Sequence, residues 1–277
     1  PLDLGGDALA EYWRLRHNAM LYDVPERPLE ISGPDAVKFL DKVLVRRTGS
    51  LGVNRAAYGL ACDVSGGLLM DGVLMRLAED RFWYVMADGE FLPWLEAQAI
   101  GMDVRVFDPG VWALQVQGAR ALEILQAVAE PAPGPDWRYF GVAQGVIGGQ
   151  PVVLSRTGWT GELGFEIYTP INGAHNEALW NTLLTVGAPF GLQSGGLASM
   201  TMRRIEAGIL DYGTDFDRGL NPWQVGLGRF VDMERGDFIG RAALADCDRT
   251  LRLTGLRCDG GVPLRGAAVR SSSGVAG

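Results

Sequence analysis

The sequence predicts an α+β fold, because a group of closely spaced strands is followed by a second unit of strands and helices. Three apolar runs, at residues 57–62, 68–77 and 82–87, are separated only by short turns, which is typical of an antiparallel meander. The second unit comes after residues 131–135 (Pro-Ala-Pro-Gly-Pro), a breaker cluster that we interpret as a loop within the core. We therefore expect a core at residues 1–245, divided roughly into 1–135 and 136–245.

The first half of the core is expected to alternate short helices with strands. Gly33-Pro34-Asp35 begins a helix that runs to Leu44, because proline fits the first helical turn, where its missing N–H is not needed. Further helices are expected at residues 7–20, 89–100 and 119–130, and further strands at residues 29–33, 104–107 and 112–117.

The sequence of the second half predicts two strands and two helices, and its hydrophobic pattern changes after them. Strands are expected at residues 152–154 and 162–168, and helices at residues 174–186 and 195–208. The first of these helices would hold His175 in its first turn. Beyond residue 246 the segments 251–258 and 267–272 are strand-like, with glycine pairs and serines around them. We expect residues 246–277 to be the start of a small β domain.

Composition excludes several classes of function. The chain has 277 residues, with 25 basic and 33 acidic side chains and a net charge of −8 at pH 7, which argues against a nucleic-acid partner. No apolar run reaches the roughly 18 residues that span a membrane, and the first residues do not resemble a signal peptide. Three cysteines without metal spacing fit a reducing compartment. We expect a cytoplasmic protein that does not bind membranes.

Histidine chemistry is not expected, because the chain holds only two histidines, His17 and His175. A metal site built on histidines and a Ser-His triad are therefore both disfavoured, and no metal is predicted. Any chemistry must depend on carboxylates, aromatic rings, arginines or a bound cofactor.

The most informative stretch is residues 155–168, Ser-Arg-Thr-Gly-Trp-Thr-Gly-Glu-Leu-Gly-Phe-Glu-Ile-Tyr. It packs three glycines, an arginine and two carboxylates between apolar runs. Glycine has no Cβ, so the backbone of this turn can approach another group closely. Glu162 lies at the end of the turn, where a carboxylate could meet an NH-rich heterocycle through two parallel hydrogen bonds. The same pattern also fits an ordinary β-hairpin turn with solvated charges.

This stretch closely resembles the signature motif of the glycine-cleavage T-protein (aminomethyltransferase) superfamily, roughly R-T-G-Y-T-G-E-x-G-F-E. Trp159 stands where the motif has tyrosine, which is similar to the branch that contains dimethylsulfoniopropionate demethylase. The resemblance covers nearly the whole chain. It implies a three-domain arrangement around a central funnel that binds tetrahydrofolate, with residues 1–245 forming two intertwined subdomains. The third domain is a β-barrel, which would be incomplete here because the chain stops at Gly277.

The resemblance also assigns a catalytic carboxylate. Residues 66–71, Gly-Gly-Leu-Leu-Met-Asp, are similar to the family pattern G-G-x-x-D-D, in which an aspartate lies beside the reactive folate nitrogen. Asp71 matches the second aspartate, and Met70 replaces the first. We expect this single acid to lower the negative charge of the site. An ordinary edge-strand aspartate is the alternative. Tyr58 lies thirteen residues earlier, on the preceding strand. It resembles a tyrosine of the family's funnel that binds folate and substrate. A core tyrosine whose hydroxyl reaches solvent is the alternative.

Three further residues carry predicted roles. Arg204 matches the arginine of the family's L-R-x-E-A-G helix and would orient Glu162 or the folate, unless it only forms a surface pair with Glu206. Trp159 would bind a sulfonium or quaternary ammonium by cation–π contact, or else pack in the core. T-proteins often carry tryptophan at the position of Arg229, a departure that again resembles the demethylase branch.

The resemblance implies a tetrahydrofolate-dependent methyltransferase that takes a methyl group from a small onium or methoxy compound. Asp71 would act in catalysis, Glu162, Arg204 and Tyr58 would bind folate, and Trp159 and Tyr58 would bind the donor. A homodimer is allowed. Three alternatives stay open: aminomethyl transfer in glycine cleavage, a folate-binding regulatory protein without turnover, and O-demethylation of methoxyaromatics. The sequence does not identify the donor.

Overall fold

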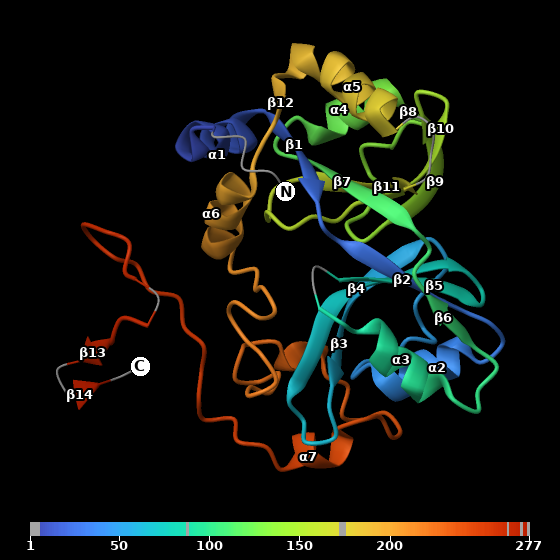
Figure 1. The fold of residues 1–277 in the computed structure, drawn as a ribbon, viewed down its shortest axis with the longest axis vertical. Coiled ribbons are helices and arrows are strands. Elements are labelled where there is room, and N and C mark those ends of the chain that lie inside the picture. Colours follow the sequence, from blue (N-terminus) through green and yellow to red (C-terminus); the bar gives the residue numbers. More distant parts are fainter. Residues whose placement is uncertain (1–5, 87–88, 172–175, 265, 272–273, 276–277) are drawn as a thin grey trace.

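Two β-sheets face each other in the computed structural model, and helices cover the outer side of each sheet (Figure 1). The structure describes residues 6–86, 89–171, 176–264, 266–271 and 274–275. Apolar side chains from both sheets meet in a buried layer, in which the rings of Trp83 and Tyr168 lie 5.8 Å apart. This layer holds the two sheets together, and the functional residues lie beside it.

The larger sheet has seven strands in the order β12-β1-β7-β11-β10-β9-β8. All of its neighbouring strands are antiparallel except β1 and β12, which are parallel. Its outer face packs against α4 (Ala121–Val128) and α5 (Asn176–Gly187). Its strands are β1 (Ala19–Val24), β7 (Val111–Gln117), β8 (Ala129–Glu130), β9 (Val142–Ile147), β10 (Gln150–Ser155), β11 (Gly164–Pro170) and β12 (Leu192–Ser194).

The smaller sheet has five antiparallel strands in the order β3-β4-β5-β2-β6. Its outer face is covered by α2 (Ala36–Val43) and α3 (Leu92–Ala99). Its strands are β2 (Arg27–Ser32), β3 (Arg55–Cys62), β4 (Leu68–Ala78), β5 (Arg81–Met86) and β6 (Arg105–Phe107). The predicted meander is confirmed as β3, β4 and β5.

The chain crosses between the sheets at a short link that matters for the site. β1 belongs to the larger sheet and β2 to the smaller one, so residues 25 and 26 span the junction. Two further helices, α1 (Ala8–His17) and α6 (Leu197–Ala207), pack against each other beside both sheets. The side chain of Asp7 caps α1 by accepting hydrogen bonds from the amides of Leu9 and Ala10.

The structure corrects the sequence predictions at several boundaries. The first helix ends at His17, and Met20, which was predicted to lie in this helix, belongs to β1. Strands β1, β8, β9 and β12 were not predicted. Residues 251–258, predicted as a strand, form no strand and are exposed. After α7 (Arg241–Ala245), the described residues form only a two-residue pairing of β13 (Arg270–Ser271) with β14 (Gly274–Val275). His175 lies outside the described residues, and the three-domain arrangement stays a prediction.

Candidate functional site

A cavity of about 300 Å³ lies beside the contact between the two sheets. Its walls come from strands of both sheets, from the turn of the signature stretch and from the loops that follow α6. Side chains with polar or charged groups are frequent in its lining, and aromatic rings complete it. The polar and aromatic lining residues are Glu26, Tyr58, Asp71, Tyr139, Phe140, Thr157, Trp159, Glu166, Asp211, Tyr212, Arg229 and Phe230.

Tyr58 and Asp71 meet in this cavity. In the β3–β4 pairing Tyr58 lies opposite Val73, so Asp71 is its diagonal neighbour on the same face. The Tyr58 hydroxyl donates a hydrogen bond of 2.5 Å to Oδ2 of Asp71. Burial raises the pKa of Asp71 to about 6, although the hydrogen bond from Tyr58 favours the ionised form. Burial and the neighbouring carboxylate raise the pKa of Tyr58 well above its ordinary value, so the phenol stays a donor.

Met70 does not belong to the cavity. Neighbouring residues of a strand point to opposite faces, and Met70 is buried in the core between the smaller sheet and its helices. Asp71 instead lines the cavity. The expectation that Met70 lowers the negative charge of the site is therefore wrong, because a side chain at position 70 faces the other side of β4.

Trp159 also lines the cavity, as predicted, but its ring is already engaged. Its indole Nε1 donates to the carbonyl of Leu210 at 3.3 Å. The guanidinium carbon of Arg204 lies 4.9 Å from the ring centroid. One cation–π contact is thus made within the protein, and a ligand cation would need the rest of the ring surface.

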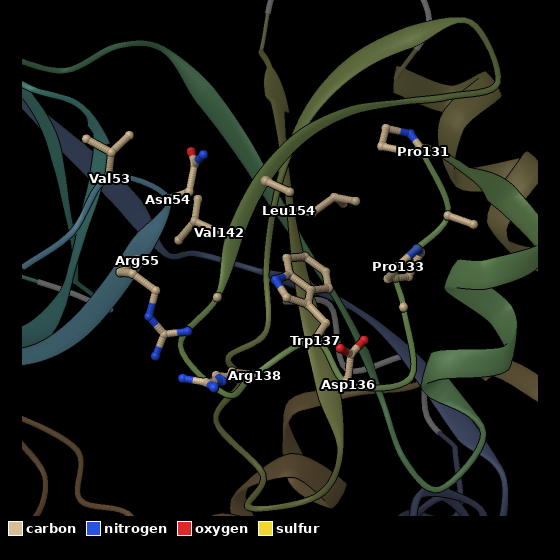
Figure 2. Close-up of a pocket in the computed structure, with 14 residues that line it drawn as sticks. Val53, Asn54, Arg55, Pro131, Pro133, Asp136, Trp137, Arg138, Val142 and Leu154 are labelled. Carbon is tan, nitrogen blue, oxygen red and sulfur yellow. The ribbon is translucent and has the colours of Figure 1, made fainter.

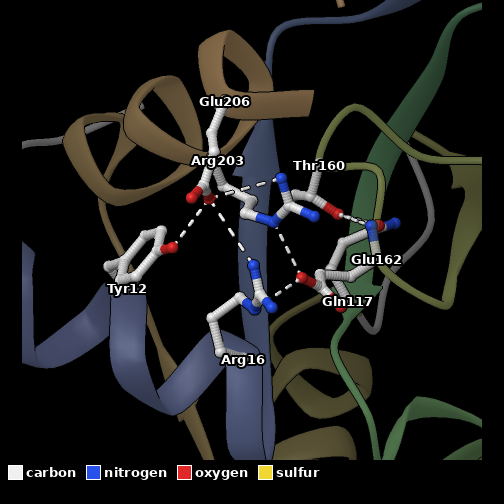
Figure 3. A network of polar contacts seen from close by, with 7 residues as sticks. All are labelled: Tyr12, Arg16, Gln117, Thr160, Glu162, Arg203 and Glu206. Atoms are coloured by element: carbon white, nitrogen blue, oxygen red, sulfur yellow. Dashed lines mark hydrogen bonds and ion pairs between the residues drawn. The ribbon is translucent and has the colours of Figure 1, made fainter. Parts of the chain in front are cut away.

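Glu162 does not line the cavity, and it is held in a network of charges between α1 and α6 (Figure 3). Its Oε1 lies 2.7 Å from Nε of Arg203 and 3.0 Å from Nε of Arg16. Both arginines also approach Glu206, which accepts a hydrogen bond from Tyr12. These contacts join the signature stretch to both helices.

Of the two adjacent arginines of α6, Arg203 contacts Glu162 and Arg204 does not. Arg204 is 3% exposed, pairs with Asp215 and donates to the carbonyl of Ile209. It therefore supports the loop after α6 and the ring of Trp159. The roles in folate binding predicted for Glu162 and Arg204 stay predictions, and neither side chain lies among the residues that line the cavity.

The glycines of the signature stretch have a structural use inside the protein. A Cβ at Gly158 would lie 2.1 Å from Nε2 of Gln117, and a Cβ at Gly164 would lie 2.1 Å from its Oε1. The buried amide of Gln117 thus sits between the two glycines. It also donates to the carbonyl of Thr157 and accepts from the hydroxyl of Thr160. The predicted close approach is confirmed, and the group approached is Gln117.

Besides Asp211, two carboxyl groups of the cavity were missed at the sequence level. Glu166 is 5% exposed, accepts from the hydroxyls of Thr157 and Tyr168, and has a pKa raised by burial. Burial and the charge of Glu166 raise the pKa of Glu26 to about 8. Among the described residues neither carboxyl forms an ion pair. Glu166 is the last glutamate of the signature stretch, which could have indicated it, whereas no pattern marks Glu26.

A second hollow of about 550 Å³ lies between residues 131–138, residues 53–55 and residues 141–143 (Figure 2). Trp137, Arg138 and Arg55 project toward it, and Pro131 and Pro133 form another side. None of the predicted site residues lines it. We therefore place the candidate site in the smaller cavity, where Tyr58, Asp71 and Trp159 converge.

The chain resembles known proteins along most of its length. The family model described as the GCVT N-terminal domain matches residues 6–235. The chain belongs to this family. It is 34% identical over 241 residues to the dimethylsulfoniopropionate demethylase of Ruegeria pomeroyi, covering 86% of this chain and 65% of the demethylase. It is 36% identical over 253 residues to the aminomethyltransferase of Streptomyces avermitilis, covering 89% and 67%.

A solved structure confirms the α+β fold of this GCVT family member. The glycine cleavage system aminomethyltransferase T of Bartonella henselae superposes with a TM-score of 0.78 at 29% identity, covering 86% of this chain and 65% of that protein. The chain thus spans about two thirds of the length of the relatives it matches. Proteins of this family use tetrahydrofolate as a substrate or cofactor.

The cavity fits the head group of tetrahydrofolate chemically. A pterin presents neighbouring N–H donors, and a carboxylate can accept two parallel hydrogen bonds from such a pair. Glu166 offers a buried carboxylate that has no cationic partner among the described residues, and aromatic rings also line the cavity. Among the described residues no group of three His, Cys, Asp or Glu side chains is arranged to hold a metal ion. No described helix is long and apolar enough to cross a membrane.

Proposed function

We propose that this protein transfers a methyl group from a small, positively charged methylated compound to tetrahydrofolate. The observation that carries the proposal is the pair of Asp71 and Tyr58 in a cavity that also holds three other carboxyl groups. Carboxylates and aromatic rings together favour a cationic donor such as a sulfonium. The name of the relative from Ruegeria pomeroyi, dimethylsulfoniopropionate demethylase, points to the same class of donor.

The reaction requires the protein mainly to align the methyl donor with the acceptor and to accept the released proton. Tetrahydrofolate supplies the nucleophilic N5, whose electron pair forms the new bond to the methyl carbon. The carbon–sulfur bond breaks with its electrons passing to sulfur, which leaves a neutral thioether. The transfer releases one proton from the acceptor nitrogen, and in our proposal the Asp71 carboxylate receives it or passes it to solvent. Tyr58 fixes that carboxylate through its hydrogen bond.

We further propose that Glu166 holds the pterin and that Trp159 borders the donor. Glu166 is buried and free of ion pairs among the described residues, so its charge is available to donors on a ligand. Trp159 presents the ring surface that Arg204 does not cover. Reactants held this way gain rate by proximity, because the methyl carbon and the acceptor are already aligned.

Formation of 5-methyltetrahydrofolate in a single turnover tests the proposal. Purified protein and tetrahydrofolate are mixed separately with dimethylsulfoniopropionate, glycine betaine, dimethylglycine and vanillate. We expect product from an onium donor, and a rate lower by about 10²- to 10⁴-fold in Asp71→Asn. Asp136→Asn, which removes the same charge from an exposed loop outside the cavity, should behave as the unchanged protein. Product from no donor would count against methyl transfer from these compounds.

Aminomethyl transfer is the second candidate, because aminomethyltransferases match this chain with similar identity and coverage. It predicts that methylenetetrahydrofolate forms only when a lipoylated carrier protein presents the aminomethyl group. The same purified protein can be tested with such a carrier. Folate binding without either product would instead support a folate-binding protein without turnover.

A further inference from the structure

Arg229 is the only cationic side chain among the described residues that line the cavity. It lies in the short helix η2 (Gly228–Phe230), and its guanidinium carbon is 4.8 Å from the centroid of the Phe230 ring. That ring in turn lies 4.8 Å from the ring of Tyr58. Arg229 is thus placed at the exposed rim of the cavity, next to the pair of Tyr58 and Asp71.

The guanidinium of Arg229 forms no hydrogen bond or ion pair with the described residues. Other arginines of the same region behave differently. Arg204 pairs with Asp215, Arg218 lies 2.8 Å from Asp63, and Arg235 lies 3.4 Å from Asp41. The fork of donors on Arg229 is therefore available to a ligand.

The other charged side chains of the lining indicate which kind of ligand group the Arg229 guanidinium would bind. Glu26, Asp71, Glu166 and Asp211 all carry carboxyl groups into the lining. The ionised carboxylates among them favour a cation and repel a ligand that also carries a carboxylate, whereas Glu26, whose pKa is raised to about 8, adds no negative charge near pH 7. The guanidinium of Arg229 at the rim offsets this repulsion for one anionic group. It can also bind that group by two parallel hydrogen bonds.

We propose that Arg229 binds a carboxylate group of a ligand that occupies the cavity. The kind of ligand rests on the proposed function, which offers two sources of this chemistry. One is the carboxylate of a zwitterionic methyl donor, whose cationic end would lie toward Asp71. The other is the glutamate tail of tetrahydrofolate.

Equilibrium binding with two matched pairs of ligands distinguishes these sources. The first pair is dimethylsulfoniopropionate and ethyldimethylsulfonium, which lacks the carboxylate. The second pair is tetrahydrofolate and 6-methyltetrahydropterin, which lacks the glutamate tail. Each ligand is titrated alone, so no methyl transfer takes place, and the result does not depend on whether the protein turns over.

The variants are Arg229→Gln and Arg229→Lys, with Arg47→Gln as the matched control. Arg47 is exposed, lies 3.8 Å from Asp232 and does not line the cavity, so its replacement removes the same charge from a neighbouring surface. We expect Arg229→Gln to weaken binding of the carboxylate-bearing member of one pair by about 10- to 100-fold. The other member of that pair should be unaffected, and Arg229→Lys should restore part of the affinity.

Each binding result either assigns Arg229 to one ligand or overturns the proposal. A loss confined to dimethylsulfoniopropionate assigns Arg229 to the donor, and a loss confined to tetrahydrofolate assigns it to the folate tail. Equal affinities of both members in every variant, or an equal loss for both members, overturn the proposal. So does an unchanged protein that binds neither carboxylate-bearing ligand. Absence of methyl transfer in the single-turnover assay, with these binding differences intact, would remove the proposed function and leave the role of Arg229 standing.

Discussion

Glu26 and Glu166 share a hydrogen-bond donor, the side-chain amide of Gln115. Nε2 of Gln115 lies 2.7 and 2.8 Å from the two carboxyl oxygens of Glu26 and 3.3 Å from Oε1 of Glu166. The three residues come from the β1–β2 link, from β7 and from β11. One amide cannot compensate two negative charges in the lining of one cavity, so the pair favours keeping a proton on Glu26.

Replacement of Glu26 by glutamine should therefore change how stability depends on pH. The pKa of Glu26 is raised to about 8 by burial and by Glu166, so the folded protein keeps a proton that the unfolded chain releases near pH 4.5. The free energy of unfolding then falls as pH rises from about 5 to about 8. Glu26→Gln, which resembles the protonated acid, should lose about 3 kcal/mol less than the unchanged protein over this range.

Urea unfolding at pH 5, 7 and 9 measures the effect. Glu177→Gln is the control, because Glu177 is exposed on α5 and does not line the cavity. If the free energy of unfolding changes equally with pH in Glu26→Gln and in the unchanged protein, the pKa of Glu26 is not raised and the prediction is wrong.

The rate of methyl transfer should rise with pH around the pKa of Asp71. Burial raises this pKa to about 6, and the ionised carboxylate is the form that accepts a proton. The single-turnover rate should increase about tenfold per pH unit well below 6 and level off above it. Asp71→Asn should be slow and lack this step, while Asp136→Asn should keep it. A step that persists in Asp71→Asn would belong to another group.

The sequence was informative where a structure depends on neighbours along the chain. Alternation and short turns correctly predicted β3, β4 and β5, and this meander brings Tyr58 and Asp71 together on one face. β12 was missed because it has only three residues and pairs with β1, far away in the chain. Residues 251–258 have the composition of a strand, but in the structure they find no partner strand.

Contacts between residues that are distant in sequence also explain why part of the site was not predicted. The environment of Glu26 is created by Gln115 and Glu166 from other strands, so nothing in its own segment marks it. Glu162 attracted attention because it ends a glycine-rich turn. Its surroundings, Arg16 of α1 and Arg203 of α6, come from both ends of the core. Charge partners that are distant in sequence decide whether a carboxylate is free for a ligand.

A comparison of two glutamates tests which of them binds folate. Glu162→Gln removes the partner of Arg203 and Arg16 and should cost about 1 kcal/mol of stability, with the Kd for tetrahydrofolate changed less than about threefold. Glu166→Gln should weaken tetrahydrofolate binding by about 10- to 100-fold. Isothermal titration and urea unfolding of both variants provide the measurements. The reverse order of the two Kd values would support the folate role that the sequence predicts for Glu162.

Gly158→Ala should destabilise the protein through Gln117. The added Cβ would lie 2.1 Å from Nε2 of a fully buried side chain, so the turn or the amide must shift, at a cost of about 1–3 kcal/mol. Gly236→Ala is the control, because a Cβ there meets nothing within 4 Å. Combining Gly158→Ala with Gln117→Ala should cost less than the sum of the two single changes, since the second removes the group that the first displaces. Additive losses in urea unfolding would mean that Gln117 is not what requires a glycine at position 158.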